Sequence, residues 1–553
     1  MMCSTATDAP TEAHGLEQMR VAAFLSDPAS YPTKPKWVER FETHGALVFL
    51  AGEGAWKIKR AVRFPYMDFS TLEKRKAACE REIEINRRLA PEIYLGLTAI
   101  TRSRDGRLHF GGTGEIVEWA VHMRRFDQAA LLSHIADAGP ILSDLAVALA
   151  DVVFESHDAA APARRDGAAE RVGRLVASVQ HTLAILTDAF DAAAVQRFGE
   201  RTAGALEHAR AILNERAAAG FVRRCHADLH LNNIVLWRGR PVLFDAIEFD
   251  EELATIDTLY DLAFLLMDLD NRGRRGVANV VLNRYLWRSG ADLDLQGLAA
   301  LPLFLGLRAA IRAMVTAERA QQEGADAGVR DRQRARDYLQ AANAYLASCP
   351  SRLIAVGGLS GTGKSTLARR LAPELGPTPG AVHLRSDLER KRLQGVEETV
   401  RLAPETYTEA ARDRIYAVLY EKARDVLAAG HAVVVDAVFA NPEQRASIEA
   451  VATELGVPFH GLWLTAPPER LVERVTARRD DASDATSKVV MRQLGWHLGA
   501  FAATWKEIDA SGSAEDTLRN ARDALALNEA GAARLGQMGP LQKGSAGHDD
   551  PQS

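Results

Sequence analysis

The sequence has little of what marks secreted, membrane-spanning or nucleic-acid-binding proteins. Its four cysteines are scattered, with neither the spacing of a metal site nor a disulfide framework. We find no uninterrupted apolar span that is long enough to cross a bilayer, and the acidic N-terminus lacks the apolar segment of a secretory signal. The formal net charge of −5 supplies no positive field for nucleic acid or an anionic membrane. We therefore expect a cytoplasmic protein without a membrane or nucleic-acid partner.

The composition is that of folded domains, with 47% hydrophobic and 25% charged residues. A chain of 553 residues is too long for one hydrophobic core, so two to four domains are expected. Cys349-Pro350 marks a boundary, because the residue before proline is disfavoured in a helix. We predict a partly flexible segment over residues 1–40, a first domain over 41–345, a second over 351–530 and a disordered tail over 536–553.

A glycine-rich stretch, Gly358-Leu359-Ser360-Gly361-Thr362-Gly363-Lys364-Ser365, stands between an apolar run and a helix-like segment. This order of strand, loop and helix is the context of a phosphate-binding P-loop, in which backbone N–H groups point at phosphate oxygens. Lys364 is expected to reach the β- and γ-phosphates, and Ser365 to hold Mg²⁺. A glycine-rich turn without a ligand is the alternative. Since every motif position is filled, we predict ATP binding by Gly358, Ser360, Gly361, Thr362, Gly363, Lys364, Ser365 and Thr366.

Apolar segments at 353–356, 433–435 and 462–464 alternate with helical segments, which predicts a parallel sheet covered on both faces. Asp387 and Asp436 follow apolar segments, at strand ends where α/β proteins bind their ligands. Asp436 is predicted to hold Mg²⁺, and Asp387 either joins that shell or orients the acceptor hydroxyl. A helix cap is the alternative for each aspartate.

Three arginines, Arg470, Arg474 and Arg478, recur at i,i+4 spacing in a helix expected to start at Pro467-Pro468. A polar loop over residues 480–485 follows them. This pattern suits a lid that closes over the transferring phosphoryl group, with Arg474 and Arg478 neutralising its charge. The alternative is a solvated cationic stripe.

The N-terminal half opens with a predicted hairpin, in which residues 46–50 and 55–59 flank the turn Gly52-Glu53-Gly54. Alternation places Lys57 and Lys59 on one face of the second strand. A capping signature at Ser70-Thr71-Leu72-Glu73 begins a helix to about Leu89 that carries Glu82. A strand lysine paired with a helix glutamate anchors phosphates in one class of kinase, although such lysines are also common on exposed hairpins.

The run His226-Ala227-Asp228-Leu229-His230-Leu231-Asn232-Asn233 precedes two short strands, the second of which ends at Asp245. The pattern is typical of a kinase catalytic loop. Asp228 would accept or orient the proton of the substrate hydroxyl, while Asn233 and Asp245 would bind the metal ions that bridge the phosphates. A polar turn between strands is the alternative. His226 is expected to be structural.

Residues 45–270 resemble the aminoglycoside phosphotransferase and choline kinase group. His226-Ala227-Asp228-Leu229-His230 stands where that group has H-G-D-L-H, and Tyr260-Asp261-Leu262-Ala263 resembles its later Y-D-L-A helix. The resemblance implies a phosphate-anchoring pair between Lys57 or Lys59 and Glu82, and a hinge near 118–124. Two departures argue against a protein kinase: only Gly52-Glu53-Gly54 stands for the glycine loop, and Asp245 is not followed by Phe-Gly.

The C-terminal half resembles small P-loop kinases, a group that includes gluconate kinase, polynucleotide kinase and chloramphenicol phosphotransferase. The P-loop, Arg385-Ser386-Asp387 with Arg390-Lys391, and Arg474 to Arg478 with the loop after it carry this resemblance. The whole chain resembles bacterial fusions of the two kinds of domain. The expected fold class is therefore an α+β protein-kinase-like domain followed by an α/β P-loop kinase domain with a parallel sheet.

These features predict a bifunctional kinase that uses ATP and Mg²⁺ to phosphorylate hydroxyl groups of small molecules. Two other hypotheses stay open. One module could bind ATP only to regulate the other, or the protein could phosphorylate nucleic-acid ends, which the lack of a basic and aromatic platform disfavours. The acceptor and the oligomeric state are not encoded in any pattern that we recognise.

Overall fold

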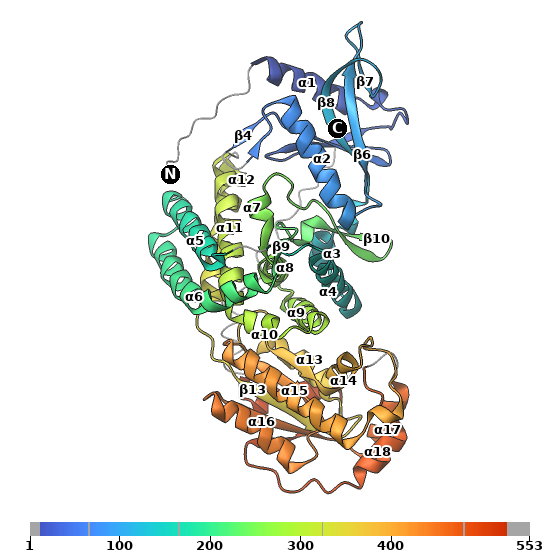
Figure 1. Cartoon of the computed structure of the whole chain (residues 1–553), viewed down its shortest axis with the longest axis vertical. Coiled ribbons are helices and arrows are strands. Elements are labelled where there is room, and N and C mark those ends of the chain that lie inside the picture. The colour runs from blue at the N-terminus through green and yellow to red at the C-terminus, as the bar shows by residue number, and fades with distance from the viewer. Residues whose placement is uncertain (1–11, 65–66, 164–165, 323–324, 479–481, 528–553) are drawn as a thin grey trace. The chain divides into compact units, whose positions relative to one another are not determined.

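The computed structural model describes residues 12–64, 67–163, 166–322, 325–478 and 482–527. The chain forms two compact units (Figure 1). The first contains the residues up to Pro140, Glu155–Ala163 and Phe221–Asp261, and the second contains Ile141–Phe154, Arg164–Gly220 and the residues from Leu262 onward. The predicted domain limits stay predictions, and the predicted tail over 536–553 lies outside the described residues.

A six-stranded antiparallel sheet in the order β1-β2-β3-β8-β6-β7 dominates the first unit. Its strands are β1 (Val38–Glu42), β2 (Ala46–Ala51), β3 (Gly54–Lys59), β6 (Tyr94–Arg102), β7 (Leu108–Phe110) and β8 (Glu115–Arg124). The β2–β3 hairpin is the predicted one, since Leu47 pairs with Ile58 and Ala51 with Gly54. A small pair, β4 (Arg63–Phe64) and β5 (Met67–Asp68), follows β3.

Helices cover both faces of this sheet. Val21 and Leu25 of α1 (Glu12–Ser26) pack on one face with Phe49 and Ile58, a helix that the sequence analysis did not anticipate. Cys79 of α2 (Leu72–Leu89) packs on the other face. The predicted helix is confirmed, but its N-cap is Thr71, whose side chain accepts the Lys74 N–H group, and not Ser70. Strand alternation therefore directs Lys57 and Lys59 toward α2, opposite Ile58.

The segment with the predicted catalytic loop forms a compact set of short elements in the same unit. These are β9 (Val222–Arg224), η3 (Leu231–Asn233), β10 (Ile234–Trp237), β11 (Arg240–Leu243), α7 (Glu251–Ala254) and β12 (Thr255–Asp257). Strands β10 and β11 form an antiparallel hairpin, and β12 pairs with β9. The unit also contains η1 (Pro28–Ser30), η2 (Gln128–Ala130) and α3 (Leu132–Ala138).

Long helices make up the first part of the second unit. They are α5 (Ala168–Ile185), α6 (Ala192–Ala218), α9 (Arg275–Ser289), α10 (Asp292–Gln296), η4 (Gly297–Ala300), α11 (Leu301–Gln322) and α12 (Ala325–Tyr345), and two more, α4 (Ser143–Asp158) and α8 (Thr258–Asn271), each contribute part of their length to it. One stretch, Asp292–Gln321, has the length and composition of a membrane span, which corrects our expectation that no span is long enough. It is 67% buried inside the protein, as a core helix is.

The rest of the second unit is a five-stranded, wholly parallel sheet in the order β14-β15-β13-β16-β17. The strands are β13 (Leu353–Gly358), β14 (Val382–Arg385), β15 (Val433–Asp436), β16 (Phe459–Thr465) and β17 (Trp505–Asp509). The central strands are buried from end to end, which explains their uninterrupted apolar sequences. The predicted parallel sheet is confirmed.

Helices and short turns connect these strands (Figure 1). They are α13 (Lys364–Leu371), η5 (Ala372–Glu374), α14 (Ser386–Leu393), η6 (Pro404–Thr406), α15 (Glu409–Ala428), α16 (Pro442–Glu454), α17 (Pro468–Ala477), α18 (Ser487–Leu494) and α19 (Ala514–Ala524). Asn441 caps α16 by accepting the Glu443 N–H group, and Pro442 is its first residue, as predicted. The sheet core packs Ile354 and Val356 against Leu367 of α13 and Leu518 of α19.

Candidate active sites

The P-loop joins the C-terminal end of β13 to the first residue of α13, Lys364. Gly358, Gly361 and Gly363 have φ angles of 140°, 90° and 92°, a region that glycine adopts without the strain of a side chain. A Cβ atom on Gly361 would lie 2.5 Å from the Leu471 carbonyl oxygen, and one on Gly358 would lie 2.7 Å from that of Leu464. The glycines therefore allow a close curl of backbone at a helix N-terminus, which fits a phosphate group.

Ser365 and Asp436 meet directly below this loop. The Ser365 hydroxyl donates a hydrogen bond to Asp436 Oδ2, which joins the start of α13 to the end of β15. Lys364 Nζ donates to the Leu359 carbonyl oxygen at 3.1 Å, so its side chain lies over the loop. One hydroxyl and one carboxylate are the oxygen ligands that Mg²⁺ takes beside nucleotide phosphates. The residues present thus fit both groups that the sequence predicted.

Charges around Asp436 keep it ionised. Burial raises the pKa of its carboxyl, but the neighbouring His383 and the positive charges of Lys364 and Arg385 outweigh burial and lower the pKa to about 2. His383 Nε2 lies 3.6 Å from Asp436 Oδ2, and burial lowers the pKa of this imidazole. Burial also lowers the pKa of Lys364, against the opposing charges of Asp436 and Asp387. The Asp436 carboxyl is therefore anionic at any physiological pH.

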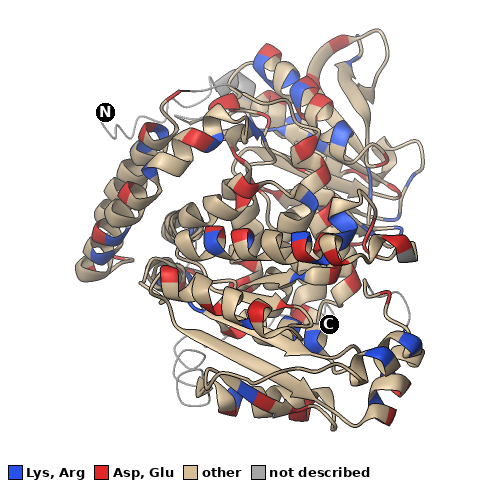
Figure 2. Cartoon of the chain, turned by 60° about the horizontal axis from the view of Figure 1, so that its bottom comes forward, with Lys and Arg blue, Asp and Glu red and all other residues tan. Residues whose placement is uncertain are grey.

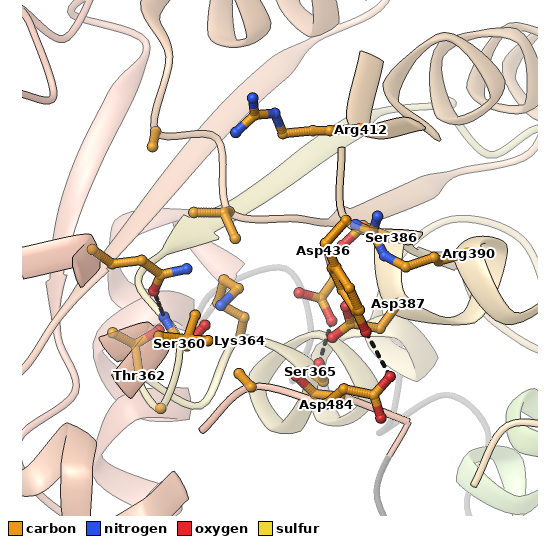
Figure 3. A pocket seen from close by; sticks show the side chains of 18 of the residues that line it. Ser360, Thr362, Lys364, Ser365, Ser386, Asp387, Arg390, Arg412, Asp436 and Asp484 are labelled. Atoms are coloured by element: carbon orange, nitrogen blue, oxygen red, sulfur yellow. Dashed lines mark hydrogen bonds between the residues drawn. The ribbon is translucent and has the colours of Figure 1, made fainter. Parts of the chain in front are cut away.

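A cavity of about 1590 Å³ opens over the P-loop (Figure 3). The predicted nucleotide residues from Ser360 to Thr366 line it, whereas Gly358 does not. Asp387, in the first turn of α14, and Asp436 face the same cavity, as do Arg474 and Arg478. Arg470 does not line it and pairs with Glu473 on the outside of α17. Four of the five predicted catalytic residues, all except Asp228, are thus gathered at this site.

Of the predicted lid loop, the structure describes residues 482–485. Asp484 in this part forms hydrogen bonds to α14 and to the segment that follows it. Asp484 accepts hydrogen bonds from Lys391 Nζ at 2.9 Å, from the Tyr407 hydroxyl at 2.5 Å and from the Leu402 N–H group at 3.1 Å. These contacts lower the pKa of Asp484 despite its partial burial, which acts in the opposite direction. Asp480 and Asp481 of the predicted loop lie outside the described residues.

Two residues at this site had no signal in the sequence. Gln493 of α18 accepts the Ser360 N–H group through Oε1 at 2.8 Å and so holds the P-loop backbone. Phe439 is fully buried with a φ of 50°, an outlying conformation for a bulky residue. The Tyr416 hydroxyl accepts its N–H group at 2.9 Å, and Arg445 donates to its carbonyl oxygen at 2.9 Å. Gln493 is 133 residues from Ser360 and Tyr416 is 23 residues from Phe439, so only the fold brings these pairs together.

In the first unit, Lys57 lies between two carboxylates. Its Nζ is 3.0 Å from Glu82 Oε1 and 2.5 Å from Asp245 Oδ1. Burial would lower the pKa of Lys57, but Asp245, Glu82 and Glu248 together raise it well above its usual value. The predicted lysine–glutamate pair is therefore formed in the structure, and Asp245 joins it.

Lys59, the other lysine that the sequence analysis named for this pair, also contacts Glu82. Its Nζ lies 2.5 Å from Glu82 Oε2 and contacts Glu248, and burial raises the pKa of that glutamate. Glu82 is completely buried between the two lysines, whose charges outweigh burial and lower its pKa. Of the two lysines, Lys57 is the one that contacts Asp245.

The catalytic-loop residues flank the β10–β11 hairpin, since Asp228 and Asn233 precede β10 and Asp245 follows β11. Asn233 Nδ2 donates to the Asp228 carboxylate and to its carbonyl oxygen, both at 2.9 Å. The Phe244 N–H group donates to the Asn233 carbonyl oxygen at 3.0 Å, which places Asn233 across the hairpin from the residue before Asp245. Asp245 has a φ of 61°, a left-handed conformation that aspartate tolerates better than most residues.

Asp261 holds the backbone of the catalytic loop through hydrogen bonds. Its carboxylate accepts the N–H groups of His226 at 3.0 Å and Ala227 at 2.8 Å, so it fixes the backbone of this loop. Ala227 has a φ of 69° where the group usually has glycine. His226 lies 2.9 Å from the Phe244 carbonyl oxygen through Nε2, and burial lowers its pKa, so the ring acts as a neutral donor that orients the loop.

The structure shows on which elements two details of the resemblance lie. The turn Gly52-Glu53-Gly54 connects β2 to β3. Residues 118–124 belong to strand β8, and the hinge expected near them stays a prediction.

A family model described as an AAA domain matches residues 353–498, which span four strands of the parallel sheet and the P-loop. Uncharacterized protein Rv2004c of Mycobacterium tuberculosis is 31% identical over 504 residues, covering 88% of this chain and 95% of that protein. Uncharacterized protein Mb2027c of Mycobacterium bovis matches to the same extent. The chain belongs to the family of these mycobacterial proteins. Because the match spans most of the chain, the family shares both parts of the architecture.

Solved structures similar to the chain include both kinds of kinase that the sequence resembles. The GDP complex of aminoglycoside 2'-phosphotransferase-IIIa is 16% identical and covers 59% of this chain and 98% of its own, with a TM-score of 0.38. A choline/ethanolamine kinase family protein from Mesorhizobium loti is 14% identical, covering 60% and 99%, with a TM-score of 0.35. A gluconokinase from Sinorhizobium meliloti is 22% identical, covering 34% and 93%, with a TM-score of 0.24. The antiparallel sheet with its helices in the first unit, and the parallel P-loop sheet that the AAA-domain model matches in the second, agree with the predicted two-part fold class.

Proposed function

We propose that the P-loop part of the chain is an ATP- and Mg²⁺-dependent kinase that phosphorylates a hydroxyl group of a small molecule. The observation that carries this proposal is the hydrogen bond between Ser365 and Asp436 at the base of the P-loop, in a cavity that also contains Asp387. Hydroxyl and carboxylate together match a metal site next to the phosphates, and a further carboxylate is available for the acceptor. The volume of about 1590 Å³ leaves room for an acceptor beside a nucleotide.

The residues at this cavity then have the following roles in the transfer. The P-loop N–H groups and Lys364 bind the phosphates, and Ser365 and Asp436 hold Mg²⁺, which when bound neutralises charge that develops on the phosphate oxygens. Asp387 orients the acceptor hydroxyl and takes its proton. The acceptor oxygen forms a bond to the γ-phosphorus while the bond from that phosphorus to the bridging β–γ oxygen breaks, so ADP leaves. Arg474 and Arg478 neutralise the charge of the transferring group.

For the first unit we propose a second ATP-dependent phosphotransfer site. Lys57, fixed by Glu82, binds the phosphates, while Asn233 and Asp245 hold the metal and Asp228 orients an acceptor hydroxyl. The contact between Lys57 and Asp245 supports a second candidate, a regulatory nucleotide site. In that case the Asp245 charge serves to hold Lys57, and this unit binds nucleotide without turnover.

The small-molecule acceptor is favoured over a nucleic-acid end by the charge pattern. Basic and acidic residues are interspersed along the helices in Figure 2, which agrees with the net charge of −5. Binding of nucleic acid relies on Lys and Arg side chains that neutralise consecutive phosphates along one face. We also propose that the protein acts in the cytoplasm, where ATP and small-molecule acceptors are present.

The test is phosphoryl transfer from labelled ATP to a panel of hydroxylated metabolites, comparing the wild-type chain with Lys364→Ala and Asp387→Asn. We expect Lys364→Ala to lose the transfer, because the γ-phosphate charge is then left without its cation. Asp387→Asn should lower kcat and leave nucleotide affinity within about threefold, since it contacts the acceptor and not ATP. Transfer that persists in Lys364→Ala and disappears in Asp228→Ala would assign the chemistry to the first unit alone.

A further inference from the structure

Helix α2 of the first unit is connected to the segment around Asp245 at two points, one helical turn apart. Glu82 contacts Lys57, which in turn contacts Asp245. Asn86 lies four residues after Glu82, on the same face of the helix, and contacts Ala246, the residue directly after Asp245. A motif indicates the role of Glu82, whereas Asn86 belongs to no motif that we recognise.

Both ends of the Asn86 amide form hydrogen bonds. Its Oδ1 accepts the Ala246 N–H group at 2.7 Å, while its Nδ2 donates to the carbonyl oxygens of Ala246 at 3.2 Å and of Glu82 at 3.1 Å. The side chain is fully buried, so water does not compete for these groups. Because the amide binds both the donor and the acceptor of one residue, it holds the Ala246 backbone in a single orientation.

Tyr94, the first residue of β6, holds the preceding peptide group. Its hydroxyl oxygen accepts the Asp245 N–H group at 3.2 Å, and the side chain is buried. The N–H groups of Asp245 and Ala246 belong to the two peptide groups that flank the Asp245 Cα atom. Two dihedral angles relate these peptide groups. Hydrogen bonds to both groups therefore set the direction in which the Asp245 carboxylate points.

The Asp245 backbone requires support, because its φ of 61° is left-handed. Residues with a Cβ atom disfavour that conformation and keep it where the surrounding structure holds them. Lys57 does not supply this support, since it contacts the tip of the side chain, which is 41% exposed, and not the backbone. Lys57 can therefore leave Asp245 for a phosphate group while the carboxylate keeps its position.

The catalytic loop holds the two ends of the same segment. The Phe244 N–H group donates to the Asn233 carbonyl oxygen at 3.0 Å, and the Ile247 N–H group donates to that of His226 at 3.1 Å. The middle of the segment is held from α2 and β6. The segment thus connects the catalytic loop to the helix and the sheet that carry the lysine–glutamate pair.

A buried asparagine can also serve packing alone, as Asn343 of α12 shows. Its Nδ2 likewise donates to the carbonyl oxygen four residues before it, that of Leu339, and to a remote one, that of Ala194 in α6. That contact joins two helices. The Asn86 contact differs because its partner adjoins a predicted metal ligand in a disfavoured conformation.

We propose that Asn86 is a positioning residue of the first-unit nucleotide site. With Tyr94 it fixes the two peptide groups around Asp245 and so directs the carboxylate to the metal position. Asn86 acts through Asp245 and not by contact with the metal. The proposal rests on the phosphotransfer function that we propose for this unit, in which Asp245 is a metal ligand. In the regulatory alternative, where Asp245 only holds Lys57, Asn86 has no such role.

The test compares nucleotide binding with and without metal in the full-length Lys364→Ala chain, whose P-loop site is disabled. A non-hydrolysable ATP analogue is titrated in a calorimeter, first with excess Mg²⁺ and then with EDTA. We expect Asn86→Leu to weaken binding of the magnesium complex about 10- to 100-fold, as is typical when a residue that orients a metal ligand is lost. Metal-free binding should change by less than about threefold, because Lys57 keeps its partner Glu82.

Two comparison variants give the opposite patterns. Lys57→Met should weaken binding with and without metal alike, since the cation for the phosphates is lost in both cases. Asn343→Leu, the matched buried amide, should change neither. This contrast separates a positioning role from a general loss of packing, which would affect both measurements together.

Tyr94→Phe carries the test where Asn86→Leu does not fold, because it removes one hydroxyl and keeps the buried ring. It should weaken the magnesium complex about threefold or more and leave metal-free binding unchanged. Equal losses with and without metal, or an unchanged magnesium complex in a folded variant, would overturn the positioning role. A Lys364→Ala chain that binds no nucleotide would overturn the first-unit site itself, and the positioning role with it.

Discussion

At the scale of single residues, the P-loop site depends on charges held in place by burial. Asp436 is 4% exposed and lies among Lys364, His383 and Arg385. A buried carboxylate is stable only when positive groups or hydrogen bonds repay its loss of water. The role as a metal ligand that we propose for Asp436 is therefore linked to its place in the electrostatics of the fold.

Asp436→Asn should weaken Mg²⁺-dependent nucleotide binding at the P-loop by about tenfold or more, since a charged ligand is replaced by a neutral amide. Because the pKa of Asp436 is lowered to about 2, its carboxylate is ionised above that value and protonates only as pH falls through it. The Mg²⁺ dependence should thus show no protonation of Asp436 between pH 8 and pH 5. Calorimetry of nucleotide binding against Mg²⁺ concentration at both pH values checks this. An equal Mg²⁺ requirement in Asp436→Asn would remove Asp436 from the metal site.

His431 is a second buried titratable group, with both ring nitrogens lacking hydrogen-bond partners. Burial and the charge of Arg275 lower its pKa to about 4. The unfolded chain binds this proton below pH 6.5 and the folded chain does not, so stability falls as pH decreases from about 6.5 toward 4.

We expect the wild type to lose about 2 kcal/mol relative to His431→Leu between pH 7.5 and pH 5.0. Urea unfolding followed by tryptophan fluorescence at the two pH values measures the difference. His208→Gln, which changes an exposed histidine of α6, is the control and should behave as the wild type. Parallel losses in His431→Leu and the wild type would contradict the assignment of a neutral, buried His431.

The first-unit residues are tested in a chain whose P-loop site is disabled by Lys364→Ala. In that background Asp245→Asn should weaken Mg²⁺-dependent nucleotide binding, because it removes a metal ligand and a partner of Lys57. Asp228→Ala should leave nucleotide affinity within about threefold and lower turnover by two or more orders of magnitude. Turnover that is unaffected by Asp228→Ala would contradict the catalytic-loop assignment, and binding without turnover would favour a regulatory site.

At the scale of elements, the outer edge of the parallel sheet is covered by α9. Asn283 Oδ1 accepts the His383 N–H group of β14 at 2.6 Å, and Asn279 donates to the Ala381 carbonyl oxygen at 3.0 Å. The Trp287 indole donates to the Leu388 carbonyl oxygen of α14 at 3.3 Å. Edge strands expose unpaired backbone groups, and α9 satisfies them with side-chain amides. The helix thereby fixes the strand that leads to Asp387.

Asn283→Val should destabilise the second unit by about 1–3 kcal/mol, because the buried His383 N–H group loses its partner. Hydrogen exchange at His383 and Leu384 should accelerate before exchange in β13 does, since β14 is the edge strand. Gln333→Leu, which removes an exposed hydrogen bond to Asp337 on α12, is the control. Unchanged exchange in β14 of Asn283→Val would show that α9 does not hold this strand.

The same scale shows which features the sequence could predict. The P-loop, its strand and its helix are contiguous, so their local pattern predicted them correctly. The Lys57–Glu82 pair and the contact between Asn233 and Asp228 could be expected from motif spacing that is typical of kinases. Helix α1 was missed because its apolar residues, Val21 and Leu25, pack on the sheet, and the sequence alone does not show that contact. Gln493 and Glu248 were missed for a similar reason, since their partners are distant in sequence.

At the scale of the whole molecule, the two nucleotide sites that we propose have different chemical designs. The first unit uses a strand lysine paired with a helix glutamate, and the second uses a backbone cradle with Lys364. The sequence did not indicate that residues 164–220 belong to the same compact unit as the parallel sheet. This grouping depends on packing between segments far apart in the chain. Neither site lacks a component that the other would supply.

The most direct test of this account is titration calorimetry of the full chain with the magnesium complex of a non-hydrolysable ATP analogue. We predict two equivalents bound by the wild type and one by Lys364→Ala. Asp245→Asn should retain the P-loop site unchanged. Coupling between the sites, where it exists, is typically about 1–3 kcal/mol, so the remaining site should keep most of its affinity. A wild-type stoichiometry of one, or loss of both sites in a folded Lys364→Ala chain, would contradict two independent nucleotide sites.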